Sequence, residues 1–172
     1  MRISLEEIEE APVRKRFRCE VSSLDLPANG SPFGGTVSVE VLLMRSREGI
    51  SAKGEISFVA QLVCSRCANS FHRSFQEHID LSYKRGEPKL EEGEVHLTEE
   101  ETRTVFYDGD FIDLTGPVRD TMLLAVPIKP LCRDDCKGLC RLCGKDLNEG
   151  PCGCKEEETD PRWRKLADLK KQ

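Results

Sequence analysis

The spacing of the cysteines constrains this chain more than any other feature of its sequence. Six of its nine cysteines fall within residues 131–154, LCRDDCKGLCRLCGKDLNEGPCGC, and a separate pair lies in the stretch VCSRC. Cys64 and Cys67, like Cys140 and Cys143, have Cys-x-x-Cys spacing, which lets two thiolates face one ion across a tight turn. A metal shell that draws ligands from both stretches would join segments about 65 residues apart and fix the path of the chain.

We predict that eight cysteines divide between two four-thiolate sites. The last four form one complete shell: Cys140, Cys143, Cys152 and Cys154. The other four form a second shell that ties the two stretches together: Cys64, Cys67, Cys132 and Cys136. The alternative sorting places residues 132, 136, 140 and 143 around one ion and gives the pair at 152 and 154 to the pair at 64 and 67. Cys19 is left over in both and is interpreted as an ordinary buried thiol.

Two observations favour metal ligation over disulfides: the compartment that the N-terminal stretch predicts, and the odd number of cysteines. The N-terminal stretch MRISLEEIEEAPVRKRFR has acidic residues where a signal peptide has its apolar segment, which predicts a cytoplasmic protein with reduced thiols. Nine cysteines would also leave one unpaired in a disulfide framework. We therefore predict two structural zinc ions, with iron as a chemically acceptable substitute. The competing interpretation is a thiol redox or metal-handling protein that uses its Cys-x-x-Cys pairs.

The remaining pattern predicts an α+β fold, an antiparallel β-sheet scaffold with one or two helices and the cysteine-rich zinc-binding segment at the C-terminal end. Residues 36–44 and 50–63 are rich in β-branched residues and are joined by the hairpin signal RSREG. Residues 70–85 suit a third strand, although their apolar spacing also fits a helix, and residues 18–21 suit an edge strand. Gly54 is interpreted as a bulge.

The domain prediction is a β-rich part, residues 1–127, followed by a cysteine-rich zinc segment, residues 128–172, tied to it through Cys64 and Cys67. The first part contains an acidic loop at 87–101, a short strand within 102–114 that ends in a turn, and a helix near 116–126 with Pro117 in its first turn. The second part ends in a helix that Asp160 caps. No apolar run approaches the roughly 20 residues of a membrane helix, so no membrane contact is expected.

The charge distribution bears on nucleic-acid binding. The net charge is −5, and residues 87–113 alone contribute −8 from ten acidic and two basic side chains. This argues against indiscriminate binding of nucleic acid but leaves room for a local basic face. One basic group surrounds Phe17, a ring that could stack on a base: Arg14, Lys15, Arg16 and Arg18. Another recurs every four residues in the cysteine segment: Arg133, Lys137, Arg141 and Lys145.

These basic groups are interpreted as RNA contacts, against the alternative that they only keep a polar module soluble. No phosphate loop, dinucleotide glycine motif or Gly-x-Ser-x-Gly is present, and no nucleophile stands beside a base. A non-enzymatic protein is therefore expected.

Four stretches together resemble a known family: LVCSRC, DLTGPVRDTMLLAVPIKPLC, DCKGLCRLCGKDLNEGPCGC and DPRWRKLADL, in this order. The resemblance is to the YceD family, the large ribosomal RNA subunit accumulation proteins, and covers residues 63–169. The family pattern has proline at the position of Arg141, where this chain departs from it. The resemblance implies a non-enzymatic ribosome biogenesis factor that promotes accumulation or processing of large-subunit (23S) ribosomal RNA. It also implies ribosomal RNA, a large-subunit assembly intermediate or a ribosomal protein as partner.

Overall fold

The computed structural model describes residues 1–8, 11–26, 31–88 and 98–154. They group into two compact units, of which the first comprises Met1–Leu62 and Ser70–Pro130 and the second combines residues 63–69 with the chain from Leu131 onward. The elements in chain order are β1 (Arg2–Ser4), η1 (Leu5–Glu7), β2 (Val13–Glu20), η2 (Val21–Leu24), β3 (Thr36–Ser46), β4 (Gly49–Val63), β5 (Ser70–Arg85), α1 (Glu99–Thr102), β6 (Thr104–Tyr107), β7 (Phe111–Asp113) and α2 (Thr115–Ala125).

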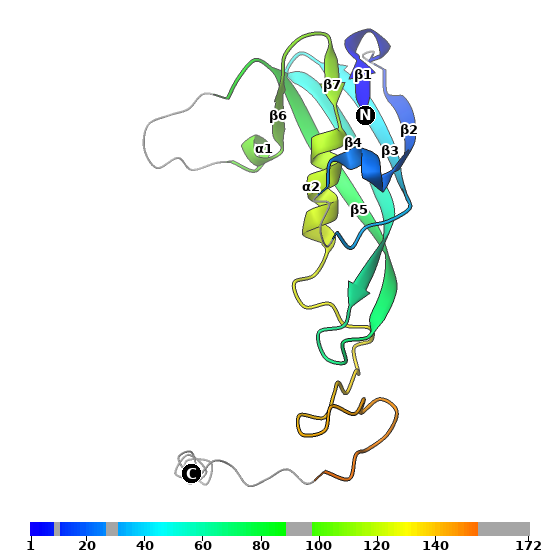
Figure 1. The fold of residues 1–172 in the computed structure, drawn as a ribbon. Coiled ribbons are helices and arrows are strands. Elements are labelled where there is room, and N and C mark those ends of the chain that lie inside the picture. Colours follow the sequence, from blue (N-terminus) through cyan, green and yellow to red (C-terminus); the bar gives the residue numbers. More distant parts are fainter. Residues whose placement is uncertain (9–10, 27–30, 89–97, 155–172) are drawn as a thin grey trace, which may run out of the picture. The chain divides into compact units, whose positions relative to one another are not determined.

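A five-stranded sheet is the scaffold of the first unit. Its strand order is β2-β3-β4-β5-β6, and the short strands β1 and β7 form a separate two-stranded sheet (Figure 1). Strands β2 and β3, and likewise β3 and β4, pair antiparallel, whereas β5 and β6 pair parallel. The parallel pair brings the carboxyl ends of β5 and β6 to the same end of the sheet.

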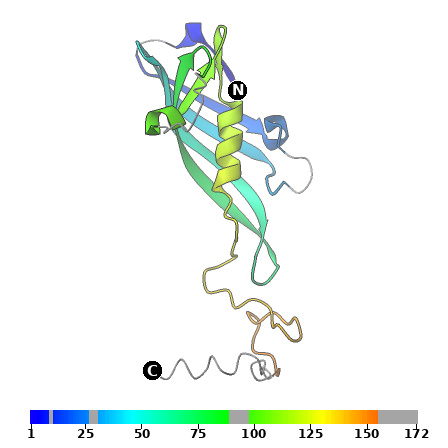
Figure 2. The ribbon, with the colours of Figure 1, turned by 90° about the vertical axis from the view of Figure 1, so that its left-hand side faces the viewer.

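One face of this sheet carries the hydrophobic core. Strand β3 alternates strictly, so that Val37, Val39, Val41 and Leu43 are buried while the residues between them face the other way. Helix α2 runs along this sheet (Figure 2) and buries Val118 and Met122 in the core. The buried Tyr83 of β5 donates a hydrogen bond of 3.0 Å from its hydroxyl to the carbonyl oxygen of Asp113 at the end of β7.

The predicted α+β fold is confirmed. The strands predicted at 36–44, 50–63 and 70–85 are β3, β4 and β5, and the helix predicted near 116–126 is α2. The edge strand is longer than predicted, because β2 begins at Val13 and not near residue 18. In the described ranges no helix is long and apolar enough to cross a membrane. The helix predicted after Asp160 lies outside the described residues.

Part of the segment predicted as an acidic loop is helical. Helix α1 begins after Thr98, whose hydroxyl accepts a hydrogen bond from the amide of Glu101. The Glu101 carboxylate in turn accepts a hydrogen bond of 2.8 Å from the amide of Thr98, which completes a capping box. These reciprocal bonds form a turn of helix where the sequence has no apolar periodicity.

The bulge predicted at Gly54 is absent from the β3–β4 ladder. Gly54 pairs with Val41 in the same register as its neighbours on both sides. Glycine is needed there for another reason, because a Cβ atom would overlap the carbonyl oxygen of Glu40 and lie 2.8 Å from the Cα of Val41. The small residue therefore permits a close approach of two strands.

Candidate metal centre

The first Cys-x-x-Cys pair lies on a tight turn that follows β4. The amide of Ala68 donates to the carbonyl oxygen of Cys64 at 2.9 Å, and the amide of Cys64 donates to the carbonyl oxygen of Asn69 at 2.9 Å. The amide of Arg66 lies 3.5 Å from the Sγ atom of Cys64 and donates to it. Ala68 has a φ of 58°, in the left-handed region, which places the second cysteine and the returning chain on the same side.

The second pair repeats this turn. The amide of Gly144 donates to the carbonyl oxygen of Cys140 at 2.9 Å, and the amide of Cys140 donates to the carbonyl oxygen of Lys145 at 2.8 Å. The amide of Leu142 donates to the Sγ atom of Cys140 at 3.4 Å. Gly144 has a φ of 73° and occupies the place of Ala68. The same cysteine turn is thus built twice, once with alanine and once with glycine at the left-handed position.

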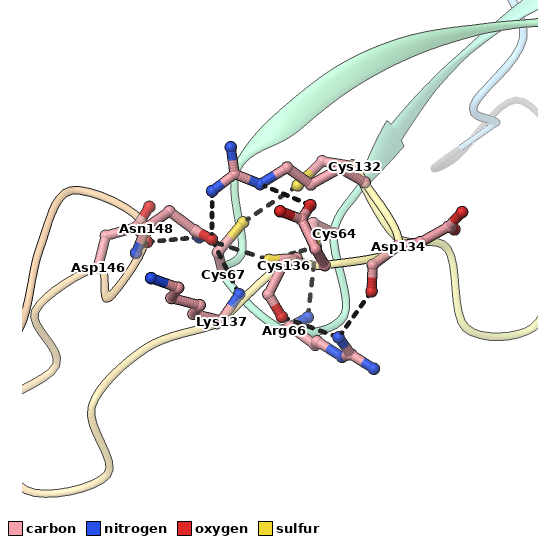
Figure 3. Close-up of polar contacts among 11 residues, drawn as sticks. Cys64, Arg66, Cys67, Cys132, Asp134, Cys136, Lys137, Asp146 and Asn148 are labelled. Carbon is pink, nitrogen blue, oxygen red and sulfur yellow. Dashed lines mark hydrogen bonds and ion pairs between the residues drawn. The ribbon is translucent and has the colours of Figure 1, made fainter.

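The first turn meets the start of the C-terminal segment in a group of four thiols. The Sγ atoms of Cys64 and Cys136 are 3.8 Å apart, and those of Cys67 and Cys132 are 3.7 Å apart (Figure 3). Four thiolates at about 2.3 Å from one tetrahedral ion have edges of about 3.8 Å. The spacing of these sulfur atoms therefore fits one ion, and it is far longer than the roughly 2.05 Å of a disulfide.

Two side chains outside the cysteines hold this cluster. The guanidinium of Arg66 donates to the carbonyl oxygens of Asp134, at 3.2 Å, and Cys136, at 2.8 Å (Figure 3). The side-chain amide of Asn148 donates to the Sγ atom of Cys136 at 3.4 Å, while its oxygen accepts from the amide of Lys137 at 2.8 Å. The Asn148 amide brings partial positive charge to the Cys136 sulfur, and the other bonds fix the path of residues 134–137.

The second group consists of the last four cysteines. Their Sγ atoms lie within 4.8 Å of one another, as do those of the first group. The two groups differ in exposure: Cys64, Cys67 and Cys136 are buried, whereas Cys143 and Cys154 are exposed. The first group is thus more shielded from solvent than the second, in which Cys140 and Cys152 are partly buried.

The thiols within each group differ in pKa. Main-chain amides of Cys132 and Cys67 lower the pKa of the Cys64 thiol to about 6, and those of Cys143 and Leu142 lower the pKa of Cys140 to about 6. Burial and the neighbouring thiols raise the pKa of Cys132 to about 12. The Cys143 side chain and then burial raise the pKa of Cys154 to about 12. One cysteine of each group is therefore readily ionised, and a cation is needed to ionise all four.

The structure brings together the cysteines of our preferred sorting. The alternative sorting would separate Cys132 and Cys136 from the first turn, whereas both lie in its sulfur cluster. All nine cysteines lie in the described ranges, and none forms a disulfide. Cys19 is half-buried on β2 and packs against the core of the first unit. The result is two groups of four cysteines, each of which can hold a metal ion.

The basic residues near the N-terminus are placed less favourably for RNA than the sequence suggested. Arg14 and Arg16 both pair with Glu40, at 2.8 and 2.7 Å, and Lys15 pairs with Glu7. Strand alternation puts Phe17 on the opposite face from Arg14, Arg16 and Arg18, where it packs against the core. The ring is therefore not presented together with the arginines, as base stacking would require.

The basic residues of the cysteine segment have different surroundings. Arg133 pairs with Asp135 at 3.3 Å and donates to the side-chain oxygen of Asn148 at 2.7 Å, so it helps to hold the first cluster. Lys145 donates to the carbonyl oxygen of Pro151 at 3.3 Å. Lys137 and Arg141 are exposed, and in the described ranges neither forms an ion pair. Among the four basic residues of the cysteine segment, these two are the ones without such contacts in the part of the chain that the structure describes.

Sequence reasoning missed the groups that support the cysteines. Asn148 lies in a turn in which its amide donates to the Asp146 carboxylate at 2.8 Å, and Asp146 also accepts from the side chain of Asn69 at 3.0 Å. Gly138 was missed as well: a Cβ atom there would lie 2.9 Å from the carbonyl oxygen of Arg66. The stretch KDLNEG signals a turn but gives no sign that its asparagine reaches a thiol.

Comparison with known proteins extends these observations. An uncharacterized protein of Mycobacterium tuberculosis is 29% identical over 136 residues, which cover 79% of this chain and 63% of that protein. The large ribosomal RNA subunit accumulation protein YCED homolog 1, chloroplastic, of Arabidopsis thaliana is 29% identical over 163 residues, 82% of this chain and 50% of that protein. The chain thus spans half to two thirds of the length of these relatives, and no solved structure matches it.

A family model covers most of the chain, including both groups of four cysteines. It is described as large ribosomal RNA subunit accumulation protein YceD and matches residues 52–170. The chain belongs to the YceD family.

Proposed function

We propose that this chain is a non-enzymatic factor that promotes the accumulation of large-subunit (23S) ribosomal RNA, with two structural zinc ions in its second unit. The observation that carries the proposal is the family match over residues 52–170, because the family is named for this role. The Arabidopsis relative carries the same name. The partner would be ribosomal RNA or an assembly intermediate of the large subunit.

The zinc part of the proposal rests on the donor sets. Each group offers four soft ligands, and a shell of four thiolates leaves no open position for a substrate or a reactive water. Each Cys-x-x-Cys pair lies on a turn and not at the start of a helix, where redox-active pairs gain reactivity from the helix dipole. Zinc in such a shell stabilises the fold of residues 63–69 and 131–154, which have few buried apolar side chains of their own.

The metal content can be measured by native mass spectrometry on protein purified without added metal or chelator. Two zinc ions per chain are expected, and Cys64→Ser and Cys140→Ser should each lose one ion. Cys19→Ser is the matched control and should keep both. A chain without metal, with several thiols open to alkylation, would favour the redox interpretation instead.

The RNA part of the proposal assigns contact to the exposed cations of the cysteine segment. Lys137 precedes the second cysteine turn, Arg141 lies within it, and both face solvent. A cluster held by metal keeps such cations in fixed positions, which lowers the entropic cost of pairing with phosphates.

The test replaces the family member of a bacterial host with this chain and measures the level of 23S ribosomal RNA. The double variant Lys137→Ala, Arg141→Ala should lower that level while metal content stays at two ions. Lys53→Ala, an exposed lysine of the first unit that pairs with Asp80, is the control and should behave as the wild type. A wild-type chain that leaves the RNA level of the deficient host unchanged would contradict the proposal.

A further inference from the structure

Three arginines of the first unit line one pocket at the end of the five-stranded sheet. The pocket has a volume of about 360 Å³ and lies where β3 turns into β4. Arg45 comes from the end of β3, Arg47 from the turn, Arg85 from the end of β5, and Tyr107 from the end of β6. None of these residues belongs to the cysteine segment or to the basic run on β2.

The topology of the sheet explains why these residues meet. Strand β4 lies beside β5, and Gly49 packs so closely on β5 that a Cβ atom there would overlap the carbonyl oxygen of Tyr83. The parallel register of β5 and β6 then places Arg85 beside Tyr107. The β3–β4 turn and the ends of β5 and β6 therefore meet at one end of the sheet (Figure 1), although no motif in the sequence predicts that they do.

The charge of this pocket is not balanced by the residues that line it. Arg103, which follows α1, pairs with Asp80 and Glu99, and Arg14 and Arg16 of β2 pair with Glu40. Within the part of the chain that the structure describes, no ion pair is formed by the pocket arginines, and the guanidinium of Arg45 donates to the neutral carbonyl oxygen of Leu5. Glu48 is the single acidic side chain in the lining, against three arginines. A bound anion would relieve the repulsion among them.

We propose that this pocket binds the phosphate backbone of an RNA strand. Guanidinium groups match phosphate oxygens in pairs, and several arginines around one concavity are suited to a phosphodiester. Tyr107 is half-buried against the core, so its ring is a fixed wall on which a nucleoside can rest. The choice of RNA over another polyanion rests on the proposed function, and the pocket adds a contact surface in the first unit.

The test measures binding of a fluorescently labelled single-stranded oligoribonucleotide of 23S sequence to the full, zinc-loaded chain at several salt concentrations. Arg47→Ala and Arg85→Ala should each weaken binding about tenfold and reduce the slope of log K against log salt by about 0.7. Arg14→Ala and Arg16→Ala are the matched controls, because both are exposed arginines already paired with Glu40. Circular dichroism checks that all four variants keep their fold.

The outcomes separate this inference from the function on which it rests. Wild-type affinity and slope in Arg47→Ala and Arg85→Ala, with loss in Lys137→Ala, Arg141→Ala, would overturn the pocket and leave the proposed function standing. Displacement of the RNA by poly-glutamate at equal charge concentration would overturn the choice of RNA in favour of an acidic protein. Loss confined to the two pocket variants and the cysteine-segment variant, with both controls unchanged, is the result we expect.

Discussion

Gly138 offers a direct test of how the cysteine segment packs on the first cysteine turn. It is buried and has a φ of 74°, and a Cβ atom on it would lie 2.9 Å from the carbonyl oxygen and 3.3 Å from the Cβ of Arg66. That carbonyl oxygen also accepts the amide of Leu139 at 3.1 Å. Gly138→Ala therefore has to displace backbone that holds the first group of four cysteines together.

Gly144 supplies a matched control in the same unit. Its φ is 73°, but a Cβ atom on it would meet nothing within 4 Å, and Ala68 already occupies the equivalent place in the first turn. Both variants carry the cost of about 1–2 kcal/mol for a side chain in the left-handed region. Overpacking adds about 1–3 kcal/mol for Gly138→Ala alone. The two variants should therefore differ by about 5- to 150-fold in an equilibrium constant.

The assay challenges the metal-loaded variants with a chelator and then maps alkylation of each cysteine by peptide mass spectrometry. In Gly138→Ala the first group, with Cys64 and Cys136, should become reactive at a chelator concentration that leaves the wild type protected. Gly144→Ala should approach the wild type in that group. Equal protection of the first group in both variants would refute the close approach of Gly138 to Arg66.

Three further predictions concern other contacts. The carboxylate of Asn148→Asp cannot donate to the Cys136 sulfur and adds negative charge beside it. The metal affinity of the first group should therefore fall about 10- to 100-fold in a chelator competition. The exposed control Glu149→Gln should leave this affinity unchanged. Gly54→Ala should destabilise the first unit by about 1–3 kcal/mol in urea unfolding followed by circular dichroism, because two strands must separate to admit the methyl group. Gly34→Ala is the control and should cost much less, because Gly34 has open space around it. Equal costs would argue against the close contact between the strands. Burial opposes ionisation of Asp113, but hydrogen bonds from Thr115 and the amino group of Met1 outweigh it and lower its pKa to about 2. The stability that this carboxylate contributes is fully present above about pH 4 and is lost as the pH falls through about 2. Asp113→Asn should therefore lower the free energy of unfolding by about 1 kcal/mol at neutral pH, a value that already allows for solvent screening of a side chain that is 40% exposed. Below about pH 2 the substitution should cost nothing. An unchanged gap between the two proteins at low pH would contradict this.

The local elements of the first unit were predictable because their signals are local. β-Branched residues in alternation mark β3 and β4, and Pro117 with an apolar stripe marks α2. Helix α1 was missed because it depends on one capping box, formed by Thr98 and Glu101, and not on periodicity. The small strands β1 and β7 were missed because three residues carry too little pattern, and pairing between distant parts of the chain creates them.

The cysteine spacing by itself predicted that the cysteines of residues 64–67 and 131–154 belong to four-thiol groups that can hold a metal ion, because cysteines at turn spacing can face one ion. Only the tertiary structure decided which cysteines share a cluster, because ligand sorting depends on where the chain returns and not on the distance between cysteines along it. The tertiary structure also decided which charged side chains lie beside each basic residue. Arg14 and Arg16 of β2 each pair with Glu40 of β3, whereas three other arginines share a pocket near the β3–β4 turn. The two sets differ because the side chains that surround them come from other stretches of the chain.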